Sequence, residues 1–412
     1  MSERTEEAGL SRLASALVEA GALTPDWLPT FEAVPRELFV PGRIWPGIAD
    51  GTEQTALVDR ANDPDAWFTA VYSDIPLTTQ WDDGRHSGDG RGATPTSSNS
   101  MPRMVFSMLV DLEVQEGHHV LEIGTGTGWN AGLLAARLGG AHVISIEYDE
   151  DVSKGAVENL RRAGLAPLAL VGDGRLGHPA GAPFDRVIAT CSVGEVPRTW
   201  IEQTRPGGVI VTPWGTDYGG ECIARLTVAD DGTANGPFTR SSAFMRLRQQ
   251  RTERPPFDAY LKGRQWPAGG ARTTSTLSPA DIGGWLEQFV IGLQMPGAFW
   301  RAERYDDGSY TLWTYSTDTR SWASADYEPG ASEYVVVQSG PRRLWDETEA
   351  AYRWWKEQGH PGFTRFGLTV DGDGERVWLD SPDCPVPDGN RGVSPAPSSP
   401  VCTASRTSPP GR

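Results

Sequence analysis

The clearest pattern of hydrophobic and polar positions lies between residues 119 and 140. An apolar run at 120–123 is typical of a short buried strand, and Gly124, Gly126 and Gly128 follow it. From 129 to 138 the apolar positions recur at helical spacing. A strand, a glycine turn and a helix in this order are typical of the nucleotide-binding corner of a doubly wound sheet.

The same alternation continues after this corner. Apolar runs predict further strands at 143–146, 167–171, 185–190, 209–214, 222–228 and 243–247, and helical spacing predicts helices at 152–163 and near 200–204. Strands that alternate with helices favour an α/β fold with a largely parallel sheet. Two further helices are expected within the first 40 residues, and the glycine-rich stretch 82–95 is expected to be a loop.

The composition changes after Arg254-Pro255-Pro256. Nine of the sixteen tryptophans fall between Trp266 and Trp378, and strands at 310–315 and 334–338 and a helix at 344–358 are expected there. This segment has enough apolar mass for an α+β domain of its own, and some of its aromatic side chains are expected to line a groove for a peptide. From Cys384 onward Pro, Ser, Gly and Thr dominate, which is typical of disorder.

The expected organisation therefore has four parts. A helical region at 1–105 covers the substrate side, a cofactor-binding domain occupies 106–253, a Trp-rich domain with a peptide-binding role occupies 254–382, and 383–412 is a disordered tail.

Bulk properties narrow the choice of partners. The 412-residue chain has a formal net charge of -17, which argues against nucleic acid or an anionic membrane as a partner. No apolar run reaches membrane-spanning length, and the charged first residues lack a signal-peptide core, so a cytoplasmic location is expected. The four cysteines are scattered, so neither a disulfide framework nor a metal site is indicated, and nothing bears on the oligomeric state.

Two acidic residues give the glycine turn its chemistry. Glu122 stands inside the strand before the first glycine, where a carboxylate suits the amino group of S-adenosylmethionine and would repel a pyrophosphate. Glu147 ends the next strand, where it can accept both ribose hydroxyls. A dehydrogenase is the main alternative, and a purely structural turn is the other.

Other candidate residues lie near the same edge of the predicted sheet. Asp173 follows the third strand directly, and the loop 191–194 follows the fourth, so both are expected at the crevice where open sheets bind ligands. The hydroxyl-rich segment 97–104 precedes the first core strand and leads into a helix. Within it Ser100 is either a helix cap or a hydroxyl that binds substrate.

Several segments together resemble the protein-L-isoaspartate O-methyltransferase family over residues 8–250. They are Val34-Pro-Arg-Glu-Leu-Phe-Val-Pro41, Ser98-Asn-Ser-Met-Pro102, the turn at 122–130, Val171-Gly-Asp-Gly174 and Pro206-Gly-Gly208. The resemblance implies a Rossmann-like class I methyltransferase that esterifies a peptide carboxylate with S-adenosylmethionine and releases S-adenosylhomocysteine. It implies that Ser100 is the active-site serine. The cofactor contacts that it implies are Glu122, Gly124, Thr125, Gly126, Thr127, Gly128, Asn130, Glu147, Tyr148, Asp173 and Gly174, and the substrate contacts are Ser98, Asn99, Ser100, Val193 and Gly194.

The chain departs from this family in two ways. Residues 80–84 and the loop after them replace a short link to the serine, and more than a hundred residues follow the sheet. Such an extension resembles the variants that tailor ribosomally made peptides (lanthipeptides, lasso peptides and ω-ester peptides). The function then expected is methylation of an aspartate in a modified peptide, whose ester cyclises to a succinimide and can open to isoaspartate.

Two alternatives to this function stay open. One is repair of isoaspartate in damaged proteins, and the other is a non-catalytic adaptor that binds S-adenosylmethionine. The substrate in both catalytic readings is a peptide or protein with an Asp or isoAsp residue. A carboxylate with a pKa of about 3.9 is already ionised at neutral pH, so methyl transfer to it needs no general base.

Overall fold

The computed structural model describes residues 3–47, 56–267 and 269–389. The chain forms two compact units, and each is built from separate segments. The first unit comprises 1–215, 220–253 and 368–375, and the second comprises 216–219, 254–367 and the residues from 376 onward. The expected boundary at 254 coincides with the main division, whereas no division falls at 106.

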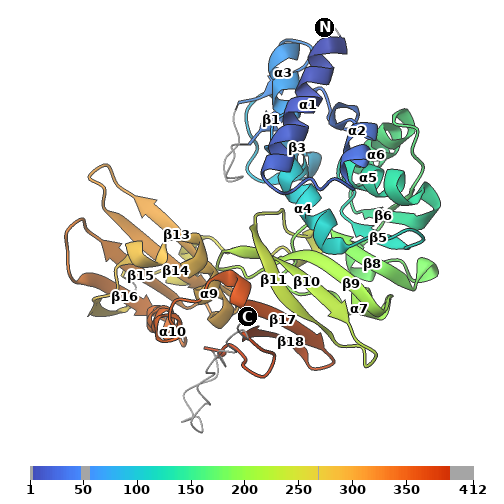
Figure 1. Cartoon of the computed structure of the whole chain (residues 1–412). Coiled ribbons are helices and arrows are strands. Elements are labelled where there is room, and N and C mark those ends of the chain that lie inside the picture. Colours follow the sequence, from blue (N-terminus) through green and yellow to red (C-terminus); the bar gives the residue numbers. More distant parts are fainter. Residues whose placement is uncertain (1–2, 48–55, 268, 390–412) are drawn as a thin grey trace, which may run out of the picture. The chain divides into compact units, whose positions relative to one another are not determined.

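One nine-stranded sheet is the centre of the first unit (Figure 1). Its order is β18-β17-β11-β10-β9-β8-β5-β6-β7. The strands are β5 (Val120–Ile123), β6 (Val143–Glu147), β7 (Leu168–Val171), β8 (Phe184–Ala189), β9 (Thr204–Gly215), β10 (Glu221–Val228), β11 (Ala234–Ser242), β17 (Phe366–Asp371) and β18 (Gly374–Leu379). The pairs from β7 through β9 are parallel, and β10 is antiparallel to both β9 and β11. The expected α/β fold is confirmed, but the sheet is mixed, because β10 and β11 extend the parallel strands β5 to β9 with antiparallel pairs.

The helices of this unit follow the expected alternation. They are α1 (Glu3–Glu19), α2 (Leu28–Ala33), α3 (Pro64–Val71), α4 (Pro102–Leu112), α5 (Trp129–Leu138), α6 (Glu150–Arg162) and α7 (Arg198–Glu202). The helix α5 begins directly after Gly128, as its apolar spacing predicted.

The N-terminal region is not a separate helical domain. It contains an antiparallel sheet of order β2-β1-β3-β4, built from β1 (Arg43–Pro46), β2 (Val58–Asp59), β3 (Leu77–Trp81) and β4 (Pro95–Asn99). Its apolar side chains share one core with the large sheet, because Leu17 and Phe31 belong to the same buried cluster as Leu133 and Val120. A common core explains why the expected boundary at 106 does not divide the chain.

One expected strand lies elsewhere. Residues 243–247 are not a strand, and β11 instead spans Ala234–Ser242, which contains Gly236 and Pro237. Both residues normally weaken a strand, so the sequence pattern gave no strand there. A Cβ atom at position 236 would lie 1.9 Å from the Arg225 carbonyl oxygen, so the close approach of β10 requires glycine.

The second unit contains a five-stranded antiparallel sheet of order β12-β16-β15-β14-β13. Its strands are β12 (Ala271–Ser275), β13 (Ala298–Arg304), β14 (Tyr310–Ser316), β15 (Trp322–Tyr327) and β16 (Tyr334–Ser339), and its helices are α8 (Phe257–Leu261), α9 (Trp285–Gln294) and α10 (Leu344–Glu357). Ile291 and Leu344 from α9 and α10 share a buried cluster with Ala323 and Val336, so these helices cover one face of the sheet. Tyr260 and Trp322 belong to a second cluster on the opposite face.

The expected disordered tail is partly outside the described residues, which end at 389. Residues 383–389 are hydrogen-bonded within the second unit, since Val386 N–H donates to the Val377 carbonyl and Gly389 N–H to the Gln294 carbonyl. Cys384 is disulfide-bonded, contrary to the expectation from cysteine spacing, while Cys191 and Cys222 are free thiols.

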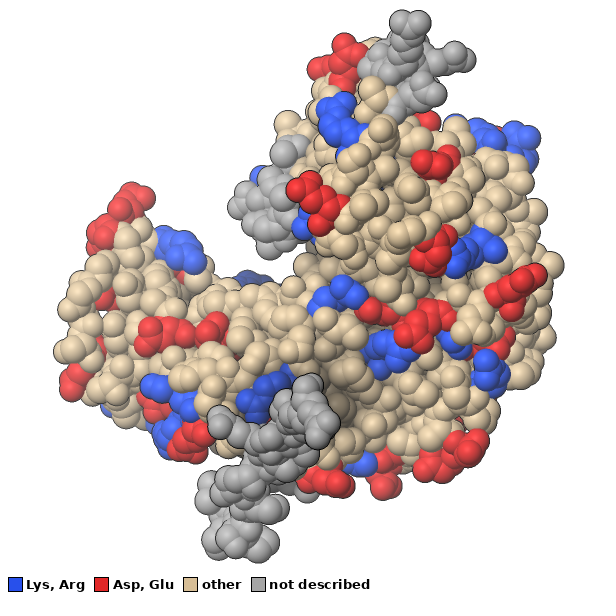
Figure 2. Space-filling model, viewed as in Figure 1, with Lys and Arg blue, Asp and Glu red and all other residues tan. Residues whose placement is uncertain are grey.

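Two surface properties bear on possible partners. Among the described helices, none combines the length and the apolar character that crossing a membrane requires. On the face in Figure 2 the described basic side chains are interspersed with acidic ones and form no continuous basic surface.

Candidate active site

The glycine turn lies where the order of the parallel strands reverses. From β5 the chain proceeds to β6 and β7 on one side and then returns to β8 on the other, and ligands of open sheets bind at such a point. Gly124, Gly126 and Gly128 have φ angles of 92°, 54° and 90°. Side chains other than glycine rarely adopt these angles, which explains why three glycines are needed here.

Glu122 stabilises the glycine turn through buried hydrogen bonds. Its carboxylate is fully buried and accepts hydrogen bonds from Asn130 Nδ2, at 2.7 Å, and from the Ser145 hydroxyl, which also bonds Thr125. Burial raises the pKa of Glu122 to about 7. These bonds hold the turn and α5 together, and the contact of Glu122 with the amino group of a cofactor stays a prediction.

Glu147 binds the turn directly. Its Oε2 accepts a hydrogen bond from Gly126 N–H at 2.9 Å, and its Oε1 accepts one from Asp149 N–H at 3.0 Å. Burial raises its pKa, although the two N–H donors partly oppose that effect. Tyr148 beside it is half exposed, with the Arg248 guanidinium 5.7 Å from its ring centroid.

Asp173 and Gly174 lie just beyond the carboxyl end of β7. Both Asp173 oxygens accept hydrogen bonds from the Arg175 guanidinium, which lowers the Asp173 pKa. A Cβ atom at position 174 would lie 2.6 Å from Ile123 Cγ2. Only glycine therefore allows β7 and its following turn to pack against the end of β5.

The expected substrate segment lies against the glycine turn. A Cβ atom at Gly126 would be 3.3 Å from the Ser98 carbonyl oxygen, and Asn99 Nδ2 donates to Thr127 Oγ1 at 2.9 Å. Asn99 is 1% exposed, so its side chain joins β4 to the turn and offers no surface to a substrate.

Ser100 is not a helix cap. The residue at the cap of α4 is Met101, which has no capping side chain. Ser100 is partly exposed, and its hydroxyl has no hydrogen-bond partner among the described residues. It remains the candidate for a hydroxyl that contacts substrate.

Arg36 fixes the position of this segment. It is 1% exposed, and its guanidinium donates to Asn99 Oδ1 at 2.7 Å and to the carbonyl oxygens of Asn99 and Ser100 at 3.2 and 2.9 Å. Further bonds reach the carbonyls of Val71, Ser73 and Ile75. Burial lowers its pKa to about 9. The segment 34–41 was singled out by its sequence, but this role of its arginine was not expected.

In the loop after β8, Val193 and Gly194 were both expected to contact substrate, and they differ in exposure. Val193 is fully buried, and its N–H and carbonyl both pair with the backbone of β9, so it has no surface for a substrate. Gly194 is exposed, and its N–H donates to Gln250 Oε1 at 2.7 Å. Of the two residues, only Gly194 can contact a ligand.

A carboxylate from the hairpin β17–β18 holds this loop in place. Glu375 Oε1 accepts a bond from Val196 N–H, and its Oε2 accepts one from Trp214 Nε1 at 2.9 Å. Burial raises the pKa of Glu375 to about 7. Sequence reasoning missed this residue because its partners lie more than 150 positions away along the chain.

The sequence analysis also did not predict a network of charged residues. Arg248 binds Asp83 Oδ1 at 3.1 Å and Asp149 Oδ2 at 2.9 Å, and Arg251 binds the same Asp83 at 2.8 Å. Gln80 Nε2 donates to Asp149 at 3.1 Å. Residues 80–84 are thereby tied to the residues that follow β6.

These features define a Rossmann-like domain of the class I methyltransferase type, in which a glycine turn, two carboxylates at strand ends and an extended hydroxyl-bearing segment meet at one edge of the sheet. The family model for protein-L-isoaspartate(D-aspartate) O-methyltransferase matches residues 52–251. A protein-L-isoaspartate O-methyltransferase of Ignicoccus hospitalis is 34% identical over 201 residues, which are 48% of this chain and 78% of that protein. The chain therefore belongs to the protein-L-isoaspartate O-methyltransferase family, whose methyl donor is S-adenosylmethionine.

Other comparisons cover less of the relatives. The Methanosarcina mazei protein of the same name is 38% identical over 156 residues, which are 37% of this chain and 58% of that protein. The match to it and to two further relatives spans 58 to 61% of their own length. A solved structure of a protein-L-isoaspartate O-methyltransferase matches with a TM-score of 0.49 and 21% identity, over 90% of this chain and 100% of that chain.

Proposed function

We propose that this chain is an S-adenosylmethionine-dependent carboxyl O-methyltransferase that esterifies the free carboxylate of an isoaspartyl residue in a protein or peptide. The relatives' shared name supports this substrate more than it supports an ordinary aspartate of a dedicated peptide. The observation that carries the proposal is the position of β4. Its end, with Ser98 and Asn99, lies directly against the glycine turn, and Arg36 holds the next residue, Ser100, by its carbonyl oxygen.

The residues at the carboxyl edge of the sheet fit the cofactor. The start of α5 has no side-chain cap, so its first N–H groups are available to a ligand. Glu147 stands where it can accept ribose hydroxyls. The same edge of the sheet also carries Tyr148, Asp173 and Gly174, which we assign to cofactor contacts. The hydrogen bonds of Glu122, Thr125 and Asn130 fix the shape of the glycine turn. When bound, the sulfonium of S-adenosylmethionine supplies the methyl group.

The protein's task is then mainly to position the substrate. The carboxylate is ionised at neutral pH, so the chain needs to supply orientation and to exclude water, which together lower a barrier by several kcal/mol. We assign the orientation to the Ser100 hydroxyl, which is free to donate a hydrogen bond to one carboxylate oxygen.

A second candidate function is dedicated tailoring of a ribosomally made peptide, in which an aspartyl ester cyclises to a succinimide. The second unit favours it, because residues 254–367 form a sheet and helices that methyl transfer itself does not require. In this case the second unit engages the peptide, and the first unit carries out the same chemistry.

The test is transfer of labelled methyl groups to two short peptides that differ only in one linkage, isoaspartyl in one and aspartyl in the other. We expect label only in the isoaspartyl peptide. Ser100→Ala should lower kcat about 10- to 100-fold, because a hydrogen bond to a charged group contributes about 1.5–3 kcal/mol, while the affinity for S-adenosylmethionine stays nearly constant. Ser332→Ala, an exposed serine of the second unit, is the matched control.

Two results would change the assignment. Label in neither peptide, together with label in a peptide encoded beside this gene and subsequent loss of methanol, would favour tailoring. Unchanged kcat in Ser100→Ala would remove this serine from the site.

A further inference from the structure

The sheet of the second unit places carboxylates beside aromatic rings on one face. Register pairs Glu303 on β13 with Thr311 on β14, and Thr311 with Asp326 on β15. Trp313 lies two residues beyond Thr311 and therefore faces the same side of the sheet. On this face the acidic residues Glu303 and Asp326 therefore lie one row away from Trp313.

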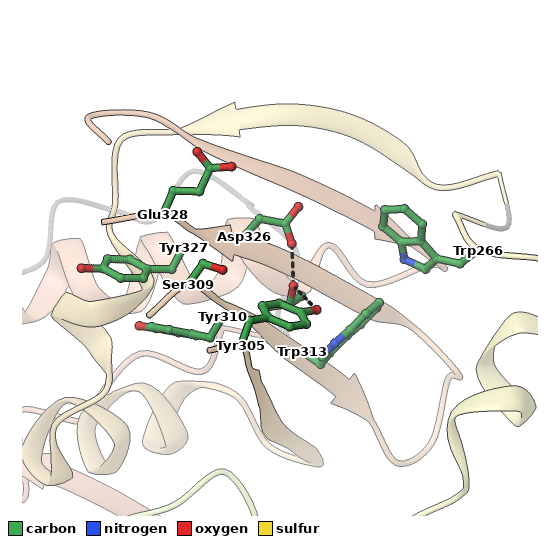
Figure 3. Close-up of a pocket in the computed structure, with 9 residues that line it drawn as sticks. Trp266, Tyr305, Ser309, Tyr310, Trp313, Asp326, Tyr327 and Glu328 are labelled. Atoms are coloured by element: carbon green, nitrogen blue, oxygen red, sulfur yellow. Dashed lines mark hydrogen bonds between the residues drawn. The ribbon is translucent and has the colours of Figure 1, made fainter. Parts of the chain in front are cut away.

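A pocket of about 440 Å³ lies over this part of the sheet. Tyr305, Trp313, Asp326 and Glu328 line it, together with Trp266 from the segment before β12. Figure 3 shows Tyr305, Trp313 and Asp326 on one side of the sheet, with Trp266 reaching toward them from a separate segment. Trp266 and Tyr305 are 44% and 48% exposed, unusually high for aromatic side chains, so their surfaces are available to a ligand.

The charge of the pocket is negative. Asp326 Oδ1 accepts one hydrogen bond, from Thr311 Oγ1 at 2.8 Å, and within the described residues neither Asp326 nor Glu328 forms an ion pair. The neighbours of Asp326 across the sheet are Thr311 and Val335, and neither is basic.

Two arginines lie close by. Arg301 pairs with Trp313 in the adjacent row, and the Arg304 guanidinium lies 5.2 Å from the Tyr310 ring centroid. Neither belongs to the residues that line the pocket, so they leave its carboxylates without a positive partner.

We propose that this pocket binds a lysine or arginine side chain of the peptide or protein that the first unit methylates. Aromatic faces attract a cation through their quadrupole, and a carboxylate adds direct charge attraction, which together favour a basic side chain over an apolar or acidic one. The pocket volume falls in the range of ligand sites. The proposal rests on the proposed function for the identity of the partner, but binding can be measured without any methyl transfer.

The test uses the full chain and two fluorescein-labelled peptides, Gly-Lys-Gly-Lys-Gly-Lys-Gly and the same peptide with norleucine in place of lysine. Fluorescence anisotropy at about 50 mM salt should give a Kd at least ~10-fold lower for the lysine peptide, since a lysine side chain in the pocket gains short-range attraction to Asp326 and Glu328. Asp326→Asn and Trp266→Ala should each weaken lysine-peptide binding about 5-fold, whereas Glu333→Gln, an exposed acid outside the pocket, removes an equal charge and should change it less than 2-fold.

Equal affinity for the two peptides, or an equal effect of Glu333→Gln and Asp326→Asn, would overturn the proposal, because the attraction would then be nonspecific. Binding of maltoheptaose that Trp266→Ala abolishes, with no binding of either peptide, would make the pocket a saccharide site instead. Failure of methyl transfer to an isoaspartyl peptide, with lysine-peptide binding intact, would refute the proposed function and leave the pocket assignment standing.

Binding of a basic side chain in the pocket should also change the kinetics of methyl transfer. An isoaspartyl peptide that carries lysines should have a lower KM than its norleucine counterpart with the same kcat, and Asp326→Asn should remove this difference. A change in kcat would contradict a role confined to binding.

Discussion

Glu375 shows how one buried carboxyl group makes the stability of the first unit depend on pH. Its pKa is about 7, above the usual 4.5, because burial penalises the charged form more than its two N–H donors favour it. The folded protein therefore binds a proton more tightly than the unfolded chain. The stabilisation is fully present below pH 4.5 and is lost as the pH rises through 7.

Replacing this group should flatten that dependence. Glu375→Gln cannot ionise, so its free energy of unfolding should rise relative to that of the wild type by about 3 kcal/mol between pH 4 and pH 8, which is the shift of the Glu375 pKa converted at about 1.36 kcal/mol per unit. Urea unfolding at several pH values measures the difference. Asp373→Asn, which replaces an exposed acid in the same hairpin, is the control. Its free energy of unfolding should depend on pH as that of the wild type does. If the free energy of unfolding of Glu375→Gln also had the pH dependence of the wild type, the carboxyl group of Glu375 would have an ordinary pKa.

At the scale of elements, the strand β4 depends on an arginine that lies more than 60 residues earlier in the chain. Arg36 donates to six acceptors at the ends of α3 and β4, and lysine has only three donors for them. Arg36→Lys keeps the charge but leaves buried carbonyl oxygens unpaired, so we expect a loss of about 3 kcal/mol or more in the free energy of unfolding. Ser100 should move with the strand, so kcat should fall at least ~10-fold, as for other groups displaced from a reactive geometry.

The control for this variant is Arg103→Lys. Arg103 is about half exposed and pairs with Asp74 at 2.9 Å, and exposed ion pairs contribute less than about 1 kcal/mol. Urea unfolding and single-turnover methyl transfer would be measured on both variants. Wild-type stability in Arg36→Lys would mean that water replaces the missing donors.

The elements differ in how far their sequence predicts them. The parallel strands and α5 are continuous in sequence, and their apolar runs and glycines carry enough local information. The strand β11 was missed because Gly236 and Pro237 resemble a loop, and only the approach of β10 makes glycine necessary there. The roles of Arg36 and Glu375 depend on partners far along the chain, so no local pattern could reveal them. The loop that contains Val193 was placed correctly, whereas the strand β4 that contains Asn99 was not predicted, and the burial of both side chains follows from tertiary packing alone.

At the scale of the whole molecule, the residues beyond 253 are not simply appended to the methyltransferase unit. The chain builds the second unit and then returns to add β17 and β18 to the large sheet, next to β11. Leu368 and Val370 of β17 are buried, and Glu375 pairs with two buried N–H groups. Residues 368–375 of the returning hairpin are therefore part of the first unit's structure, even though the family model ends at 251.

Ending the chain after Glu253 should consequently destabilise the first unit. Truncation would expose the edge of β11 and leave the Trp214 and Val196 donors unpaired, and a loss of about 3 kcal/mol corresponds to a fall in Tm of roughly 6–12 °C for a unit of this size. Calorimetry of the truncated and full-length proteins, each with S-adenosylhomocysteine, measures this fall. A synthetic peptide of residues 363–382 added to the truncated protein should recover part of it, whereas a peptide of the same composition in scrambled order should not. If the truncated protein instead melted at the full-length temperature, the hairpin would be dispensable, and the second unit could be treated as a separable substrate-binding module.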